Sequence, residues 1–189
     1  PAVFTIPSSF TTIADNAFED VTTLTSITIP NTITTIGNYA FKQTTNLDTV
    51  IFEENSILAT IGVASFQNLT KLTSITIPNS VTSIEQYAFD NTQSLVSVTF
   101  EPGSSLLTIG KKAFRYLVDL PSITIPKSVT TAEVPNKPTA VTFADVPRRP
   151  IAVTFAEVAS VFKSETISDV AKVFISATAS LVPSNPIFV

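Results

Sequence analysis

The chain of 189 residues contains no cysteine, methionine, tryptophan or histidine. Their absence removes thiol and imidazole nucleophiles, the imidazole general base and every metal site built from Cys or His ligands. We therefore expect no enzymatic activity, no catalytic residue, no cofactor and no metal site. The lack of thiols does not indicate a compartment, because a chain without them is indifferent to redox conditions.

Charged residues are also scarce, at 14% of the chain, with 11 Lys+Arg against 15 Asp+Glu. An acidic chain with so few cations is poorly suited to a phosphate backbone, so we expect no nucleic-acid partner. The longest apolar tract, residues 170–182, contains Lys172 and is shorter than the ~20 residues that span a bilayer. Because the chain starts at Pro1 without an initiator Met or signal-peptide pattern, we expect a processed product or a fragment.

A skeleton of apolar residues recurs through the first two thirds of the chain. Phe is followed by Leu six residues later and by Ile or Val nine residues later, five times in all. The five sets are Phe18/Leu24/Ile27, Phe41/Leu47/Val50, Phe66/Leu72/Ile75, Phe89/Leu95/Val98 and Phe114/Leu120/Ile123. Fixed apolar offsets with variable polar residues between them indicate a stacked repeat. One unit buries too little apolar surface to offset its own ordering, so its neighbours must cover its open faces.

Successive Phe residues lie 23, 25, 23 and 25 residues apart, and the alternation comes from one link in each unit. The links over 29–36 and 77–84 are short, whereas those over 52–61 and 100–109 are two residues longer. We place the extra residues on an outward bend, because lengthening a loop costs little closure entropy. Glycine at positions 37, 62 and 110 is predicted to permit the next bend through its wider choice of backbone angles.

Each unit begins with β-branched residues that alternate with period two, as in Ser-Ile-Thr-Ile at 74–77. The alternation predicts a short strand with one face in the core and one in solvent. Proline at 30, 78 and 126 ends such strands, because it has no N–H to donate. The outward residues, which are our candidate binding residues, are Ser26, Thr28, Thr49, Ile51, Ser74, Thr76, Ser97, Thr99, Ser122 and Thr124.

This outward ladder has three interpretations. Ser and Thr suit any solvated strand face, so their presence in the ladder can be explained without a binding function. It also offers a regular surface on which a protein or a glycan can dock. A third interpretation is an ice-binding lattice, since strands ~4.8 Å apart would space the hydroxyls regularly. Ile51 interrupts the row of hydroxyls, which weighs against the lattice.

Two further groups of side chains are candidates for contact with a partner. Tyr39 and Tyr87 occupy equivalent positions two repeats apart, where they form either a contact stripe or partly buried packing. Lys111, Lys112 and Arg115 form a basic group in an otherwise acidic repeat region, which is either a docking site or a solvated face.

Glu53 and Glu54 lie on an inserted loop, and Glu101 lies two repeats further on. General acid–base catalysis would need such carboxylates in a cleft with partners close by. The spacing of these three residues offers no such cleft, so we assign them no catalytic role.

The repeat pattern fails after Val129, which divides the chain into a solenoid over 1–131 and a C-terminal part over 132–189. The latter is predicted to be an irregular cap or a small separate module of mixed strand and helix. Within it, 141–143 repeats the Val-Thr-Phe of 98–100 and could be a last strand of the same sheet, while 155–162 and 170–181 have helical spacing. The apolar tail could also meet the first coil of another copy, giving end-to-end self-association into a fibre.

Residues 74–84 (Ser-Ile-Thr-Ile-Pro-Asn-Ser-Val-Thr-Ser-Ile), followed by Ala88-Phe89 and Leu95, resemble the BspA-type leucine-rich repeat family. The resemblance covers residues 3–131, as five units and part of a sixth. It implies a leucine-rich repeat solenoid with a parallel sheet on one face and short helical or extended segments on the other. It also implies an extracellular or cell-surface protein that adheres to or binds a protein or glycan.

The chain departs from that family at one position. The family often places Cys three residues after the Phe, and here the position holds Val21, Thr44, Leu69, Thr92 and Leu117. No property that depends on those cysteines carries over to this chain.

Overall fold

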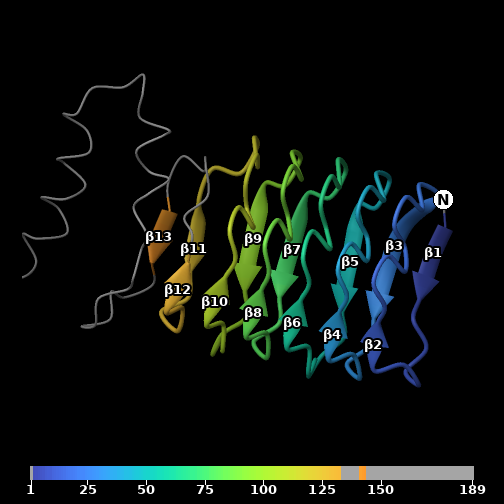
Figure 1. Ribbon diagram of the computed structural model, residues 1–189, viewed down its shortest axis with the longest axis horizontal. Helices are drawn as coiled ribbons and strands as arrows, with labels where there is room; N and C mark the ends of the chain where they lie inside the picture. The colour runs from blue at the N-terminus through green and yellow to red at the C-terminus, as the bar shows by residue number, and fades with distance from the viewer. Residues whose placement is uncertain (1, 133–140, 144–189) are drawn as a thin grey trace, which may run out of the picture. The chain divides into compact units, whose positions relative to one another are not determined.

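The computed structural model describes residues 2–132 and 141–143, which lie in the first of two compact units, Pro1–Thr154 (Figure 1). The chain winds through six coils, where a coil is one turn of a solenoid, and a last strand begins a further coil. The second unit, Phe155–Val189, lies outside the described residues, and so do the helices predicted over 155–162 and 170–181.

Each coil gives one strand to a front sheet and one to a back sheet (Figure 1). The front strands are β1 (Ala2–Thr5), β3 (Leu24–Ile29), β5 (Thr49–Phe52), β7 (Ser74–Ile77), β9 (Ser97–Phe100), β11 (Ile123–Ile125) and β13 (Val141–Phe143). The back strands, of two residues each, are β2 (Thr12–Ile13), β4 (Thr35–Ile36), β6 (Thr60–Ile61), β8 (Ser83–Ile84), β10 (Thr108–Ile109) and β12 (Thr131–Ala132).

All of the hydrogen-bonded strand pairs among the described residues are parallel. This confirms the predicted leucine-rich repeat solenoid, and the pairing of β13 with β11 confirms the strand predicted at 141–143. The second face was predicted to be helical or extended, and within the described part of the chain it is extended, with no helix. The back sheet is continuous in the order β12-β10-β8-β6-β4-β2.

The front sheet is not continuous. Its hydrogen-bonded groups are β1-β3-β5, β7-β9 and β11-β13, so the ladder is broken between β5 and β7 and between β9 and β11. We call these two breaks the seams. The sequence shows the alternation of short and long links, but we did not predict the seams from it.

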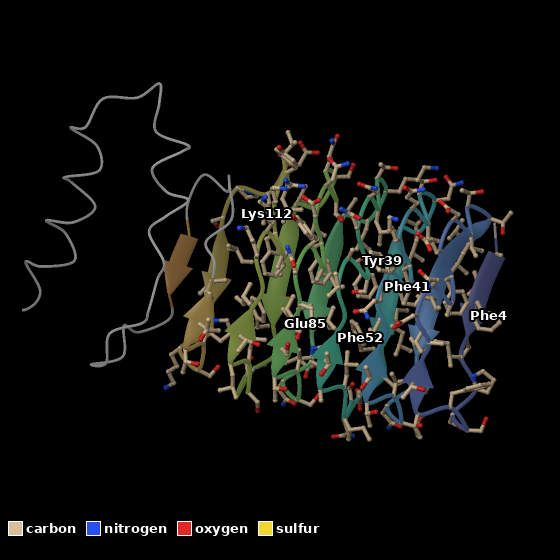
Figure 2. All side chains as sticks on the ribbon, in the orientation of Figure 1. Phe4, Tyr39, Phe41, Phe52, Glu85 and Lys112 are labelled. Atoms are coloured by element: carbon tan, nitrogen blue, oxygen red, sulfur yellow. The ribbon has the colours of Figure 1, made fainter. Side chains whose placement is uncertain are left out.

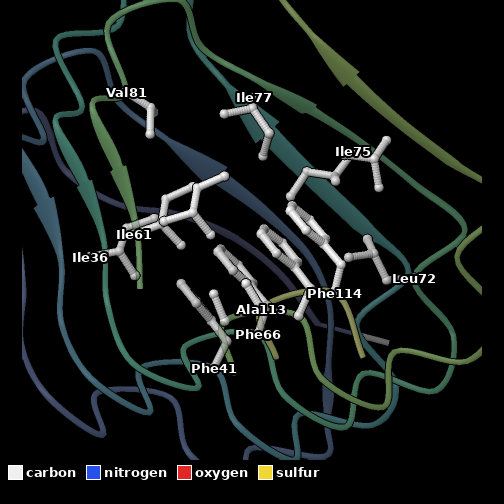
Figure 3. Close-up of a cluster of buried hydrophobic side chains, with 14 of the residues drawn as sticks. Ile36, Phe41, Ile61, Phe66, Leu72, Ile75, Ile77, Val81, Ala113 and Phe114 are labelled. Atoms are coloured by element: carbon white, nitrogen blue, oxygen red, sulfur yellow. The ribbon is translucent and has the colours of Figure 1, made fainter. Parts of the chain in front are cut away.

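The core contains a column of five aromatic rings, which come from five successive coils. Phe18, Phe41, Phe66, Phe89 and Phe114 stack with ring centroids 5.1–5.4 Å apart and interplanar angles of 2–8°. Figure 3 shows Phe41, Phe66 and Phe114 of this column among the buried side chains. From Phe41 onward these rings are buried, and the Ile, Leu and Val residues of the repeat surround them. Such offset stacking adds to the large apolar area that each ring removes from water. The axial alignment of equivalent residues that the repeat predicted is therefore confirmed.

The glycines at the bends serve a purpose other than the predicted one. Among the glycines of the described residues, only Gly103 has a positive φ, at 77°. A Cβ on Gly62 would lie 2.6 Å from the carbonyl oxygen of Ile36, and a Cβ on Gly110 would lie 2.5 Å from the backbone nitrogen of Gln86. These glycines therefore allow close approach to the preceding coil, and not an unusual dihedral angle.

Left-handed backbone instead occurs at side-chain-bearing residues. Around each of the five stacked Phe residues, the residues two before and two after it have φ between 50° and 62°. They are Asn16, Asp20, Tyr39, Gln43, Ala64, Asn68, Tyr87, Asn91, Lys112 and Tyr116. Non-glycine residues pay a steric cost in this region. Each ring of the aromatic column is therefore flanked by two strained corners.

This strain leads to a prediction for Ala64, which has φ 50° and is buried. Ala64→Gly is expected to leave the unfolding midpoint unchanged or to raise it, because relief of about 1 kcal/mol of strain offsets the entropy that glycine loses on folding. Ala40→Gly is the control, since Ala40 is buried without a positive φ, and it should destabilise by about 1 kcal/mol. Equal losses of unfolding free energy in the two variants, measured by urea denaturation, would contradict the strain assigned to Ala64.

Candidate functional site

The predicted outward ladder lies on the solvent face of the front sheet. Seven of its ten residues are exposed and three are half-buried. The half-buried residues are Ser26, Thr28 and Ser97. The exposed residues are Thr49, Ile51, Ser74, Thr76, Thr99, Ser122 and Thr124.

Register aligns these residues in rows across the bonded strands. Thr76 lies beside Thr99, and their hydroxyl oxygens are 2.9 Å apart. In the first group Thr28 lies beside Ile51, whose side chain is 47% exposed and carries no hydroxyl. Since the rows also stop at each seam, the face consists of short hydroxyl-bearing segments and is not one uniform lattice.

Proline contributes to each seam. At the bonded step β7/β9 the residue after the second strand, Glu101, donates its N–H to the last carbonyl of the first strand, Ile77 O, at 3.0 Å. At the β9/β11 seam the equivalent donor would be Pro126, and at the β5/β7 seam it would be Pro78. Neither proline has an N–H, so the ladder cannot close at that end of the strands.

Proline alone does not open the ladder. β3 is also followed by a proline, Pro30, yet β3 pairs with β1. At that end of the pair the donor lies in the first coil, where Ile6 N donates to Thr28 O at 3.1 Å. Both seams additionally follow a strand that ends in Phe, at Phe52 and Phe100, where β3, β7 and β11 end in Ile. Each seam therefore combines a larger inward side chain before it with a missing donor after it.

The β9/β11 seam holds a groove of about 640 Å³. Four of the ten ladder residues line it, namely Ser97 and Thr99 on one wall and Ser122 and Thr124 on the other. The structure thus gathers part of a ladder that looked uniform in sequence into one concave site. The other six residues do not line this groove.

Two of the three carboxylates considered for catalysis bind the backbone of the preceding coil. Glu53 Oε2 accepts the N–H of Asn31 at 3.1 Å, and Glu101 Oε2 accepts that of Asn79 at 3.0 Å. Both pairs are 22 residues apart, so each long link is tied to the short link before it. Asn and Glu recur at equivalent positions in the sequence, and this recurrence indicates the contact, which we did not predict.

The rings of Tyr39 and Tyr87 lie beside cations. Figure 2 labels Tyr39 and Lys112 among these residues. Lys42 Nζ is 5.2 Å from the ring centroid of Tyr39, and Lys112 Nζ is 5.7 Å from that of Tyr87. The Arg115 guanidinium contacts both Tyr87 and Tyr116, at 5.2 and 4.5 Å. Tyr39 is 39% exposed and Tyr87 is half-buried, so these rings combine packing with a cation–π contact.

Arg115, which we grouped with the basic residues, belongs to a buried ion pair that the sequence analysis missed. Its Nε and Nη2 donate to Asp90 Oδ1 and Oδ2 at 2.8 and 2.9 Å, and Gln67 Nε2 donates to the same carboxylate at 2.8 Å. The side chain of Asp90 is only 3% exposed, and that of Arg115 is 22% exposed. The hydrogen bonds to Asp90 raise the pKa of Arg115 above its ordinary value, so the guanidinium stays charged.

Residues 2–102 and 59–134 match the family described as BspA type Leucine rich repeat region, in six copies. The chain belongs to the BspA-type leucine-rich repeat family.

Two of its departures at the family's Cys position have a structural role. Thr44 and Thr92 are buried there, and their hydroxyls donate to the Phe18 and Phe66 carbonyl oxygens at 2.7 and 2.9 Å. At these two positions the hydroxyl therefore links its coil to the one before it.

Solved leucine-rich repeat structures resemble this chain. The pneumococcal vaccine antigen PcpA is 30% identical with a TM-score of 0.65, over 76% of this chain and 40% of PcpA. A leucine-rich repeat protein from Eubacterium ventriosum is 23% identical with a TM-score of 0.54, over 69% of this chain and 41% of that one. A leucine-rich cell surface protein from Faecalibacterium prausnitzii is 27% identical with a TM-score of 0.47, over 69% of this chain and 43% of that one. This chain thus spans about 40% of the length of these proteins.

No curated protein matches the chain. Over the residues that the structure describes, no helix of sufficient length and apolar character to cross a membrane is found.

Proposed function

We propose that this BspA-type repeat chain is a non-enzymatic recognition module, exposed at a cell surface or secreted, that binds a protein partner through its front sheet. The observation that carries the proposal is the concave site between β9 and β11, lined by four residues of the exposed ladder. The family supports protein binding as the class of function. The proposed location draws on the description of PcpA, a similar protein, as a vaccine antigen.

The arrangement favours recognition over the other interpretations. Glu53 and Glu101, two of the three carboxylates considered for acid–base chemistry, are engaged with backbone N–H groups. An ice-binding face would need hydroxyls at regular spacing, and the seams and the exposed Ile51 interrupt the rows. A hydroxyl-bearing surface with a groove is better suited to a protein ligand, whose polar groups can pair with it.

The proposal is tested by screening the protein against immobilised extracellular proteins and glycans, and then repeating the strongest interaction with Thr76→Lys. Thr76 is exposed beside Thr99, so a lysine there should weaken binding about tenfold or more through steric obstruction and an unpaired charge.

Thr108→Lys is the matched control, because Thr108 is an exposed residue of the same kind in the back strand β10. It should bind as the unmodified chain does. Equal binding by all three proteins would refute recognition through the front sheet. A hit among the glycans that Thr76→Lys abolishes would retain the surface and overturn the choice of a protein partner.

A further inference from the structure

The back sheet carries a row of hydroxyls of its own, which we call the back row. Its strands are joined without a break from β2 to β12, whereas the front sheet is interrupted at the seams (Figure 1). The second residue of each back strand is buried, so the first faces outward. That outward residue is Thr or Ser in all six strands, and register places the six side by side: Thr12, Thr35, Thr60, Ser83, Thr108 and Thr131.

Most hydroxyls of the back row are left to the solvent. Three of its residues are exposed and three are half-buried. Ser83 donates its hydroxyl to the Glu85 carboxylate. Within residues 2–132 and 141–143, none of the five threonine hydroxyls of the row has a hydrogen-bond partner in the protein. Since a hydroxyl can both donate and accept, these five bind water.

The front ladder differs in this respect. The hydroxyls of Thr76 and Thr99 lie 2.9 Å apart and bond to each other, and Thr49 bonds to the Asp48 carboxylate. Hydroxyls that are paired within the protein have fewer bonds left for an ordered layer of water. The back row is therefore the better candidate for a lattice of bound water.

The back row is also regular and straight. Strands lie ~4.8 Å apart in a sheet, so the five steps of the row cover about 24 Å. Neighbouring strands usually twist by about 20–25°, but successive Phe rings of this core differ by only 2–8°. The coils therefore stack with little rotation. Two residues beyond the row, positions 37, 62 and 110 are glycine, so no side chain rises beside it in those coils.

We propose that the back row binds ice. Water held at each threonine hydroxyl repeats at the strand spacing, which is close to the spacing of oxygen atoms along a face of an ice crystal. Ordered waters that bridge two surfaces bind nearly as well as direct contacts, so a row of them attaches the protein to the crystal. The objections to the front ladder do not apply, because the back row has no seam and no residue without a hydroxyl.

This inference goes beyond the proposed function, because it concerns the other sheet and a different ligand. A protein bound to ice stops the crystal from growing until the solution is cooled further. The measurement is thermal hysteresis, the gap between the melting and growth temperatures of a single ice crystal in a solution of the whole chain. A second measurement follows the coarsening of ice grains in a frozen sucrose solution. The chain should open a gap and keep the grains small. Absence of both effects would overturn the inference.

The face is tested with Thr108→Lys and Thr60→Lys, each of which places a long, charged side chain in the back row. Both should lose most of the thermal hysteresis, because the side chain holds the row away from the crystal. Thr108 is exposed and Thr60 is half-buried, so the first variant tests the face even if the second does not fold. Urea denaturation followed by circular dichroism checks that each variant is folded.

Thr76→Lys is the matched control, since Thr76 is an exposed threonine of the front strand β7. It should keep the full thermal hysteresis. Equal hysteresis in Thr108→Lys and Thr76→Lys would overturn the assignment to the back row.

The two proposals fail in different ways. Ice binding that Thr108→Lys abolishes, together with partner binding that ignores Thr76→Lys, would refute recognition through the front sheet and retain the back row. Partner binding that Thr76→Lys weakens, in a chain without thermal hysteresis, would retain the recognition module and refute ice binding.

Discussion

Phe66→Ala is expected to lower the free energy of unfolding by about 3–5 kcal/mol, the usual cost of removing a buried aromatic ring. Phe66 is fully buried, and its ring stacks on Phe41 and Phe89 at 5.2 Å on each side. Its loss leaves a cavity in the middle of the column and removes two ring contacts. In a solenoid each coil is stabilised by its neighbours, so the change weakens the interfaces on both sides.

The measurement is denaturation in urea followed by far-ultraviolet circular dichroism, with Phe10→Ala as the matched control. Phe10 is 54% exposed, so its truncation should cost less than about 1 kcal/mol. If Phe66→Ala does not fold, Phe66→Leu is the second variant. It should fold and should unfold at a lower urea concentration than the unmodified chain. Equal midpoints for Phe66→Leu, Phe10→Ala and the unmodified chain would contradict a core built on the aromatic column.

Arg115→Ala is expected to cost about 3–5 kcal/mol, because it leaves the buried Asp90 carboxylate without a cation. Of the side-chain hydrogen bonds that the described residues donate to that carboxylate, only the one from Gln67 would remain. Asp90 and Arg115 are the residues that directly follow Phe89 and Phe114, so the pair joins the same two coils that flank the groove. Its removal should therefore loosen the solenoid where the front ladder is already open.

Lys42→Ala is the control for Arg115→Ala, since Lys42 occupies the equivalent position and pairs with Glu19 at 3.0 Å. Both partners of that pair are 26% exposed, so its loss should cost no more than about 1 kcal/mol. The double variant Asp90→Leu/Arg115→Met removes both charges and should recover most of the stability, because no unpaired charge remains in the core. A double variant as unstable as Arg115→Ala would show that packing, and not the uncompensated charge, sets the cost.

Much of the solenoid could be predicted from the sequence because its signal is a spacing. Phe41, Phe66 and Phe89 recur with the offsets of a stacked coil, and each lies in the aromatic column. Period-two alternation likewise predicted which residues of 74–77 face inward, since strand geometry sends successive side chains to opposite faces. The purpose of the bend glycines was predicted wrongly, because a close approach to Gly62 depends on a neighbouring coil that local sequence does not show.

The candidate site was predicted only in part. The outward ladder was identified, but nothing in its alternation distinguished Ser97 and Ser122, which line the groove, from Ser26, which does not. The Asp90–Arg115 pair was missed for a related reason, since residues 25 apart come into contact only once their coils are stacked.

The sequence by itself determined the repeat, the inward and outward faces, the strand-ending prolines and the alternation of link length, because each depends on residues close together in one coil. Tertiary structure decided which front strands bond to each other, which carboxylates bind a neighbouring backbone, and where a groove opens. Those outcomes depend on how one coil fits against the next. Between β9 and β11 the ladder is broken where the Phe100 side chain lies before the break and Pro126, which has no N–H, lies after it. These two residues become neighbours only when their coils stack.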